Sequence, residues 1–159
     1  METPQEYRKL GLEVGQGKYH DELVYGIGLV YISMINEIGD YLKDYDLTPT
    51  DMNILMLVKH QGEDQGISQI DLGTKLMVTA HNMTRAIQKL EEKWYLKRIS
   101  YKKDARVKLV TIKIRGAQLL DKIWAGYDKK LQELASKVSV EKQKIMANLL
   151  HEWLNNKGA

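Results

Sequence analysis

The sequence of 159 residues contains no cysteine. Disulfides, thiolate nucleophiles, cysteine-ligated zinc or iron–sulfur centres and cysteine-based redox switches are therefore excluded. Charged residues interrupt the apolar stretches well short of the roughly 20 residues that a membrane-spanning helix needs. The first residues, Met1-Glu-Thr-Pro-Gln-Glu, are polar and acidic, unlike a basic segment that leads into an apolar one. These absences predict a soluble cytoplasmic protein of single-domain length, as a monomer or an oligomer.

Motifs for catalysis and nucleotide binding are also missing. The Gly-rich run from Gly11 to Lys18 resembles a phosphate loop, but Leu12 and Tyr19 occupy the positions where a Walker A motif needs Gly and Ser or Thr. The sequence has no Gly-x-Ser-x-Gly elbow, no dinucleotide fingerprint and no convincing pair of carboxylates. We therefore predict no enzyme activity and no cofactor.

A metal site is not expected either. The four histidines are scattered along the chain, at His20, His60, His81 and His151. His20 is followed by Asp21 and Glu22, but adjacent residues of a helix do not face one point. His151-Glu152 lacks the second histidine of a zinc protease motif.

What the sequence does contain is a concentrated positive charge. Residues 75–115 hold 12 Lys and Arg against 3 Asp and Glu, a net charge of +9, whereas the rest of the chain holds 12 against 18, a net charge of −6. Such a basic segment indicates a polyanionic partner, although a solvated basic face without a partner would have the same composition.

Helical periodicity begins after a Gly-rich N-terminal extension, residues 1–18. Apolar residues recur at helical spacing over 21–42, on two stripes. Three later segments open with a hydroxyl that can cap a helix, at Thr48, Ser68 and Thr79. They predict helices over about 49–60, 69–76 and 80–93, the last two separated by a short break as in a helix-turn-helix.

The period then changes to that of strands. Residues 96–101 and 107–114 are rich in β-branched, Tyr and Leu residues, and the charged segment between them predicts a two-stranded hairpin with a basic tip. Two amphipathic helices follow, from about Gly116 and from about Ser139.

Within the predicted helix 80–93, one face is apolar and the opposite face is polar. The polar side chains have suitable lengths for base edges and phosphates in a major groove, with Arg suited to guanine and Gln to adenine. An ordinary solvent face is the alternative. The candidate base contacts are Ala80, His81, Thr84, Arg85 and Gln88, with Asn82 and Lys89 better placed for phosphates. The hairpin tip adds Lys102, Lys103, Asp104 and Arg106.

This order of motifs resembles the MarR family of winged-helix regulators, from about Leu47 to Leu120. The matching residues are Leu72, Leu76, Val78, Thr79, Met83-Thr84-Arg85, Leu90-Glu91-Glu92-Lys93, Asp104-Ala-Arg106, Val110 and Gly116. The resemblance implies that the helix from Thr79 is the recognition helix and that Arg106 enters the minor groove, positioned by Asp104. The chain departs from the family's usual residues at Trp94, where Gly is usual, at Met77, where Gly is common, and at Lys113, where Thr is usual.

We therefore predict a mainly α fold with a small β-hairpin wing. Residues 47–115 are expected to form a winged helix-turn-helix DNA-binding domain, and residues 19–46 with 116–159 a helical dimerisation region. The resemblance implies an obligate dimer, and the apolar stripes of the outer helices independently favour one. The function predicted is a homodimeric regulator that binds a pseudo-palindromic double-stranded DNA operator, with repression released by a small-molecule effector of unknown identity. The alternative is a winged-helix protein-interaction module without DNA binding.

Overall fold

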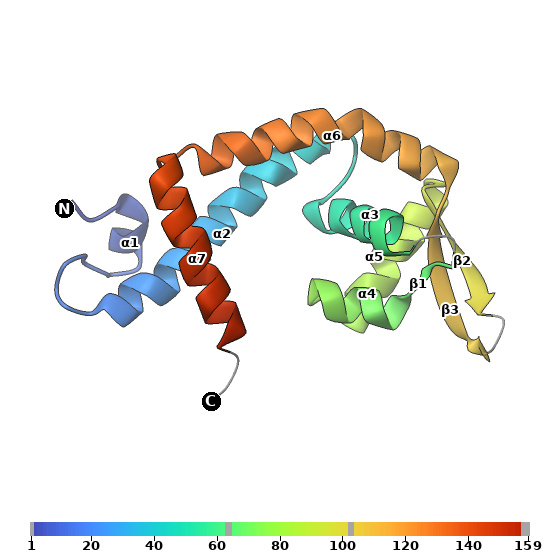
Figure 1. Ribbon diagram of the computed structural model, residues 1–159, viewed down its shortest axis with the longest axis horizontal. Helices are drawn as coiled ribbons and strands as arrows, with labels where there is room; N and C mark the ends of the chain where they lie inside the picture. The colour runs from blue at the N-terminus through green and yellow to red at the C-terminus, as the bar shows by residue number, and fades with distance from the viewer. Residues whose placement is uncertain (1, 63–64, 102–103, 157–159) are drawn as a thin grey trace. The chain divides into compact units, whose positions relative to one another are not determined.

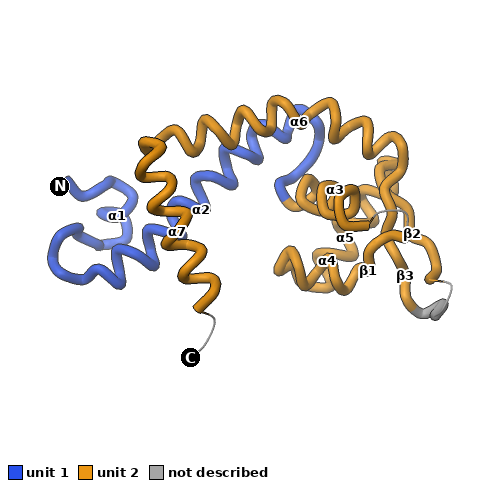
Figure 2. The backbone as a smooth tube through the Cα atoms, in the orientation of Figure 1, with its two compact units in different colours: residues 1–49 blue, residues 50–159 orange. Residues whose placement is uncertain are grey.

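The computed structural model of the chain describes residues 2–62, 65–101 and 104–156, and at residues 104–106 it describes the backbone alone. Two compact units make up the chain, residues 1–49 and residues 50–159 (Figure 2). Each unit is described by itself below.

The first unit contains α1 (Gln5–Lys9) and α2 (Tyr19–Lys43). The long helix α2 extends the predicted helix 21–42 by a few residues, whereas α1 lies in the N-terminal extension and was not predicted. The Tyr7 hydroxyl donates a hydrogen bond of 2.7 Å to the backbone carbonyl of Glu22 and so ties α1 to α2. A Cβ atom at Gly26 would lie 2.2 Å from that hydroxyl, so this contact requires glycine.

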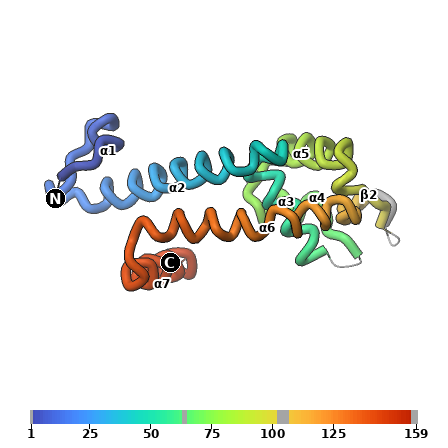
Figure 3. Tube along the Cα trace, turned by 90° about the horizontal axis from the view of Figure 1, so that it is seen from above, coloured from blue at the N-terminus to red at the C-terminus, as the bar shows by residue number. Residues whose placement is uncertain are grey.

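The second unit holds the remaining elements, in the order helix, strand, two helices, two strands and two helices (Figure 1). They are α3 (Pro49–Gln61), β1 (Ile67–Ser68), α4 (Gln69–Leu76), α5 (Ala80–Glu92), β2 (Leu96–Tyr101), β3 (Asp104–Ile112), α6 (Ile114–Ala135) and α7 (Val140–Asn155). The helices α4 and α5 contact each other and the strands, which gathers the helix-turn-helix against the sheet. Helix α6 leads from the end of β3 to α7 (Figure 3).

The sheet has three strands in the order β1-β3-β2, all antiparallel. Ile67 of β1 pairs with Val110 of β3, and Leu96 of β2 pairs with Ile112. The prediction of a two-stranded hairpin therefore missed β1. A strand of two residues is too short to show an alternating pattern, and its partner lies far along the chain.

The elements from α3 to β3, hereafter the winged lobe, share an apolar core. Its fully buried side chains come from α3, α4, α5, β2 and β3, and they include Met52, Ile54, Leu55, Leu72, Met83, Ile87, Leu90, Leu96 and Val110. The prediction of a mainly α fold with a small β wing is confirmed.

Helix α6 closely approaches the residue that precedes β2. A Cβ atom at Gly116 would lie 2.4 Å from the carbonyl oxygen of Tyr95, so no larger residue fits there. The amide of Lys113 donates to the same carbonyl at 2.8 Å. Helix α6 consequently begins at Ile114, two residues before the predicted start.

Over the ranges that the structure describes, none of the helices is long and apolar enough to cross a membrane. Those ranges also contain no group of three or more His, Asp or Glu side chains placed to hold a metal ion.

Candidate nucleic-acid interface

The interface begins with the two capped helices α4 and α5. The Ser68 hydroxyl accepts a hydrogen bond of 3.1 Å from the amide of Asp71, and the Thr79 hydroxyl accepts one of 3.4 Å from the amide of Asn82. Both bonds satisfy a first-turn amide that has no partner within the helix. Between the helices, Met77 adopts the left-handed conformation, with φ of 52°. The predicted caps Ser68 and Thr79 and the predicted break between the helices are confirmed, while the predicted cap Thr48 stays a prediction.

Helix α5 separates an apolar face from a polar one. Met83, Ile87 and Leu90 are fully buried in the lobe. The residues predicted to contact DNA from this helix are exposed together at its start and along the opposite face: Thr79, Ala80, His81, Asn82, Thr84, Arg85 and Gln88. Lys89 is half-buried on the flank.

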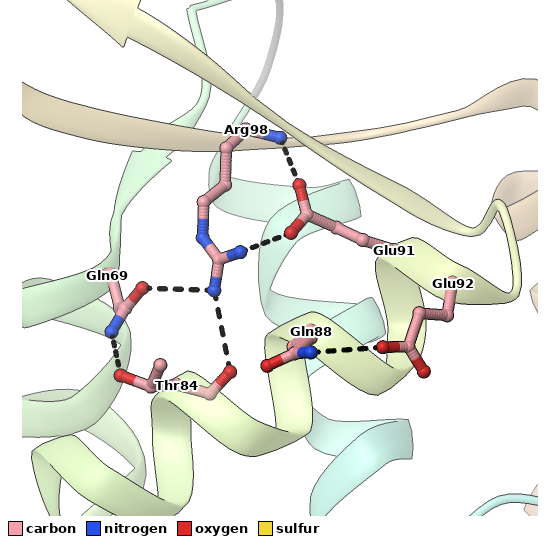
Figure 4. Close-up of polar contacts among 6 residues, drawn as sticks. All are labelled: Gln69, Thr84, Gln88, Glu91, Glu92 and Arg98. Carbon is pink, nitrogen blue, oxygen red and sulfur yellow. Dashed lines mark hydrogen bonds and ion pairs between the residues drawn. The ribbon is translucent and has the colours of Figure 1, made fainter.

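Besides the cap Thr79, Thr84 and Gln88 also have hydrogen-bond partners within the lobe. The Thr84 hydroxyl donates to the carbonyl of Ala80 at 2.8 Å and accepts from Nε2 of Gln69 at 2.6 Å. Nε2 of Gln88 donates to Oε1 of Glu92 at 3.1 Å (Figure 4). The Gln88 bond lies on the surface and leaves the amide oxygen available, whereas both bonding directions of Thr84 serve the lobe itself.

Arg98 on β2 joins the sheet to both helices, a feature that the sequence did not predict. Its guanidinium forms an ion pair with the Glu91 carboxylate, and its amide donates to the same carboxylate at 2.7 Å. The guanidinium also donates to Oε1 of Gln69 and to the carbonyl of Thr84, both at 3.4 Å (Figure 4). Because this one side chain of β2 bonds both α4 and α5, it fixes the orientation of α5 relative to the rest of the lobe.

A second ion pair holds the flank of α5. Nζ of Lys89 lies 2.8 Å from Oδ2 of Asp51 on α3, and Asp51 is only 2% exposed. A carboxylate buried to this extent needs compensation by charge or hydrogen bonds. Lys89 therefore has a structural partner in addition to any role at the DNA backbone.

The wing supplies the rest of the predicted interface. Lys108 on β3 donates to the Ser100 hydroxyl on β2 at 2.8 Å, so this part of the hairpin is cross-linked by side chains. Lys102 and Lys103 lie outside the described residues. Asp104 and Arg106 lie on β3, and their side chains lie outside the description. The predicted roles of these four residues stay predictions.

A capped pair of helices, an exposed polar face on the second helix and an antiparallel wing define a winged helix-turn-helix protein. Residues 47–108 match the sequence profile of the MarR family. The transcriptional regulator MhqR of Bacillus subtilis is 29% identical over 120 residues, which cover 76% of this chain and 81% of that protein.

Solved structures share the fold. A MepR–DNA complex from S. aureus has a TM-score of 0.74 at 22% identity and covers 84% of this chain and 96% of its own. A mutant of E. coli MarR complexed with operator DNA has a TM-score of 0.75 at 22% identity and covers 83% of this chain and 93% of its own. These similarities support a MarR-family winged helix-turn-helix regulator, with the family match over residues 47–108.

Proposed function

We propose that this transcriptional regulator acts as a homodimer that binds a specific double-stranded DNA sequence through α5 and the wing. The observation that carries the proposal is the exposed polar face of α5, which lies within the segment of net charge +9. Phosphate neutralisation by this charge supplies affinity, while donors and acceptors on α5 supply sequence preference. The MepR and MarR structures in complex with DNA support the same role for this fold.

Base recognition is assigned to the exposed side chains of α5. Arg85 is suited to the acceptors of guanine and Gln88 to adenine, with His81 and Ala80 beside them. Asn82 and Lys89 are proposed to contact phosphates, together with the amides at the start of α5 that Thr79 helps to position. Thr84 contributes through its bonds to Gln69 and Ala80, which set the surface that the bases meet.

The wing is proposed to contact the backbone and the adjacent minor groove. Lys102 and Lys103 add positive charge, and Arg106 enters the groove in an orientation set by Asp104, as the family resemblance implies. A narrow minor groove has an enhanced negative potential that attracts arginine.

Dimerisation is supported by apolar surface outside the lobe. Helix α7 has no buried residue, and its exposed apolar side chains include Ile145, Met146, Leu149, Leu150, Trp153 and Leu154. Helix α2 of the other unit exposes Leu23, Val24, Tyr25, Ile27, Val30, Tyr31, Ile32 and Met34. Faces of this kind mark interaction surfaces, and a second copy of the chain offers the same faces in return.

We further propose that the dimer represses transcription by covering a pseudo-palindromic operator, and that a small molecule releases it. Two recognition helices can read successive half-sites about 34 to 36 Å apart only if the dimer holds them at that separation. An effector that favours another separation by a coupling of about 1 to 3 kcal/mol would release the operator.

The proposal is tested by fluorescence anisotropy with duplexes selected from a random library and with a scrambled duplex, each at two salt concentrations. We expect a large preference for the selected duplex and weaker binding at higher salt, because released counterions drive the association. A chain without salt-dependent DNA binding would instead be a protein-interaction module.

The wing is tested in the same assay with two substitutions. Arg106→Ala should weaken binding to most sequences alike. Asp104→Ala should also weaken binding, although removal of an acid would otherwise strengthen it. Tighter binding by the Asp104→Ala variant would remove the positioning role of Asp104.

A further inference from the structure

Trp94 is held in a backbone conformation that disfavours it. It follows the last turn of α5 with φ of 64°, and its amide donates to the carbonyl of Glu91 at 2.9 Å while the amide of Tyr95 donates to that of Leu90 at 3.0 Å. This pair of bonds ends a helix with one left-handed residue, a position that glycine fills without strain. A bulky side chain there is an outlier that costs conformational free energy.

Burial in the core does not compensate for this strain, because Trp94 is 62% exposed. It lines a shallow open groove at the base of the wing, whose other lining residues are Lys97, Ile112, Lys113, Ile114 and Arg115. Ile114 is itself 79% exposed. The apolar part of the groove lining therefore consists of one aromatic and two aliphatic side chains.

The rim of the groove is positive. Nζ of Lys113 lies 3.8 Å from the centre of the Trp94 ring, and the Arg115 guanidinium lies 5.5 Å from the centre of the Tyr95 ring. In the part of the chain that the structure describes, no carboxylate pairs with Lys97, Lys113 or Arg115. Lys89 and Arg98, by contrast, each have an acidic partner.

The position of the groove separates it from the proposed DNA contacts at the wing tip. It lies where Leu96 pairs with Ile112, at the opposite end of β2 from the hairpin tip. Five steps of ~3.3 Å along the strand place the two end residues of β2 roughly 17 Å apart.

We propose that this groove, hereafter the Trp94 groove, docks an acidic amphipathic segment of a partner protein. Carboxylates of the segment bind Lys97, Lys113 and Arg115, and an apolar side chain packs on Trp94 and Ile114. A phosphate backbone would satisfy the cations but would leave the exposed aromatic and aliphatic surface without a partner, so a protein segment fits the groove better than DNA does. This function goes beyond operator binding and does not depend on it.

The test uses the full-length chain and a short synthetic peptide of alternating glutamate and leucine pairs, labelled for fluorescence anisotropy. Two matched peptides replace all glutamates by glutamine or all leucines by serine. We expect saturable binding of the first peptide and at least tenfold weaker binding of both controls, because the Trp94 groove uses charge and apolar contact together.

Substitutions in the Trp94 groove test whether the peptide binds there. Trp94→Gly should weaken peptide binding at least tenfold while the melting temperature stays the same or rises by about 2 to 4 °C, because glycine removes the backbone strain. Lys97→Gln and Arg115→Gln should each weaken it severalfold, whereas Lys122→Gln, an exposed lysine of α6 outside the groove, should not change it. DNA affinity should stay within about twofold of wild type for Trp94→Gly.

Four results would overturn the proposal. One is the absence of saturable peptide binding, and another is binding that Trp94→Gly leaves unchanged. A large fall in melting temperature would make Trp94 a structural residue, and a loss of DNA affinity in the Lys97→Gln and Arg115→Gln variants would assign the groove to DNA.

Discussion

Helices α5 and α7 are both amphipathic, but the apolar stripe of α5 is buried and that of α7 is exposed. In the lobe, the apolar stripe of α5 is covered by the chain's own elements, so that Met83, Ile87 and Leu90 are fully buried. Helix α7 has an apolar stripe of similar spacing, yet none of its residues is buried. The difference indicates a division of labour. The lobe carries the candidate DNA contacts, whereas α7 carries the apolar surface that we propose joins two copies of the chain.

Removal of α7 should have the largest effect on operator affinity of all the predicted changes. Truncation before Ser139 leaves every proposed DNA contact in place, but we expect a monomer that binds the operator roughly a thousandfold more weakly, because the two half-sites are no longer linked. Analytical ultracentrifugation measures the oligomeric state, and fluorescence anisotropy measures operator affinity.

Point variants serve as the control for that truncation. Leu150→Glu and Trp153→Glu should also dissociate the dimer, and Lys144→Glu, an exposed charge on the same helix, should have a much smaller effect. A soluble truncated monomer that binds two half-sites with wild-type affinity would show that α7 has no part in operator binding.

Within the lobe, substitution of Arg98 should have the next largest effect, on stability and on DNA specificity. Arg98→Ala removes bonds to Glu91, Gln69 and Thr84 at once. We expect a loss of about 1.5 to 3 kcal/mol in the free energy of unfolding, since bonds to charged groups have this magnitude. The ratio of specific to non-specific DNA affinity should fall as well, because α5 loses the bonds that orient it.

Exchange of the two charges distinguishes the contribution of the Glu91–Arg98 ion pair from that of the other Arg98 contacts. The double variant Glu91→Arg, Arg98→Glu keeps opposite charges at the two positions and should recover part of the stability lost in either single variant. If Arg98→Ala lowers stability but leaves the specificity ratio at the wild-type value, Arg98 holds the fold without orienting α5 for DNA.

The part of this site that the sequence predicts is the part encoded locally. The caps Ser68 and Thr79 bond to amides three residues away, and the buried stripe of α5 repeats every three or four residues, so both are visible as patterns. Arg98 bonds to Gln69, which is 29 residues distant, and nothing in the pattern of β2 distinguishes it from its neighbour Lys97. Contacts of this kind depend on the tertiary structure and have no local signature.

Lys89 should show a smaller effect that has two origins. Lys89→Ala removes the partner of the buried Asp51, and we expect a loss of about 1 to 2 kcal/mol in the free energy of unfolding, reduced because Lys89 is itself 38% exposed. If Lys89 also neutralises a phosphate, the slope of log K against log salt falls by about one unit.

Asp51→Asn is the matched variant, since it breaks the same ion pair and leaves the lysine available for DNA. It should lower stability without lowering the salt slope. Equal salt slopes for wild type and Lys89→Ala would show that Lys89 pairs with Asp51 and does not neutralise a phosphate.

The same contrast between local and distant contacts explains the strand that was missed. The hairpin of β2 and β3 follows from two alternating runs with a charged turn between them. Strand β1 forms only because Ile67 and Ser68 meet Val110 and Leu109 across the sheet. Helix α6 begins earlier than predicted for a related reason, because the Tyr95 carbonyl accepts a hydrogen bond from the amide of Lys113 just before the helix.

The central claim is that α5 reads base edges as one of a symmetric pair of helices, and selection of binding sites from a random duplex library tests it most directly. For the wild type we expect two inverted half-sites whose centres lie about one helical turn apart. The double variant Arg85→Ala, Gln88→Ala should lose about 1 to 3 kcal/mol per substituted contact on that site and relax the preference at the bases involved. An unchanged base preference in this double variant, or a wild-type site without two-fold symmetry, would contradict the account.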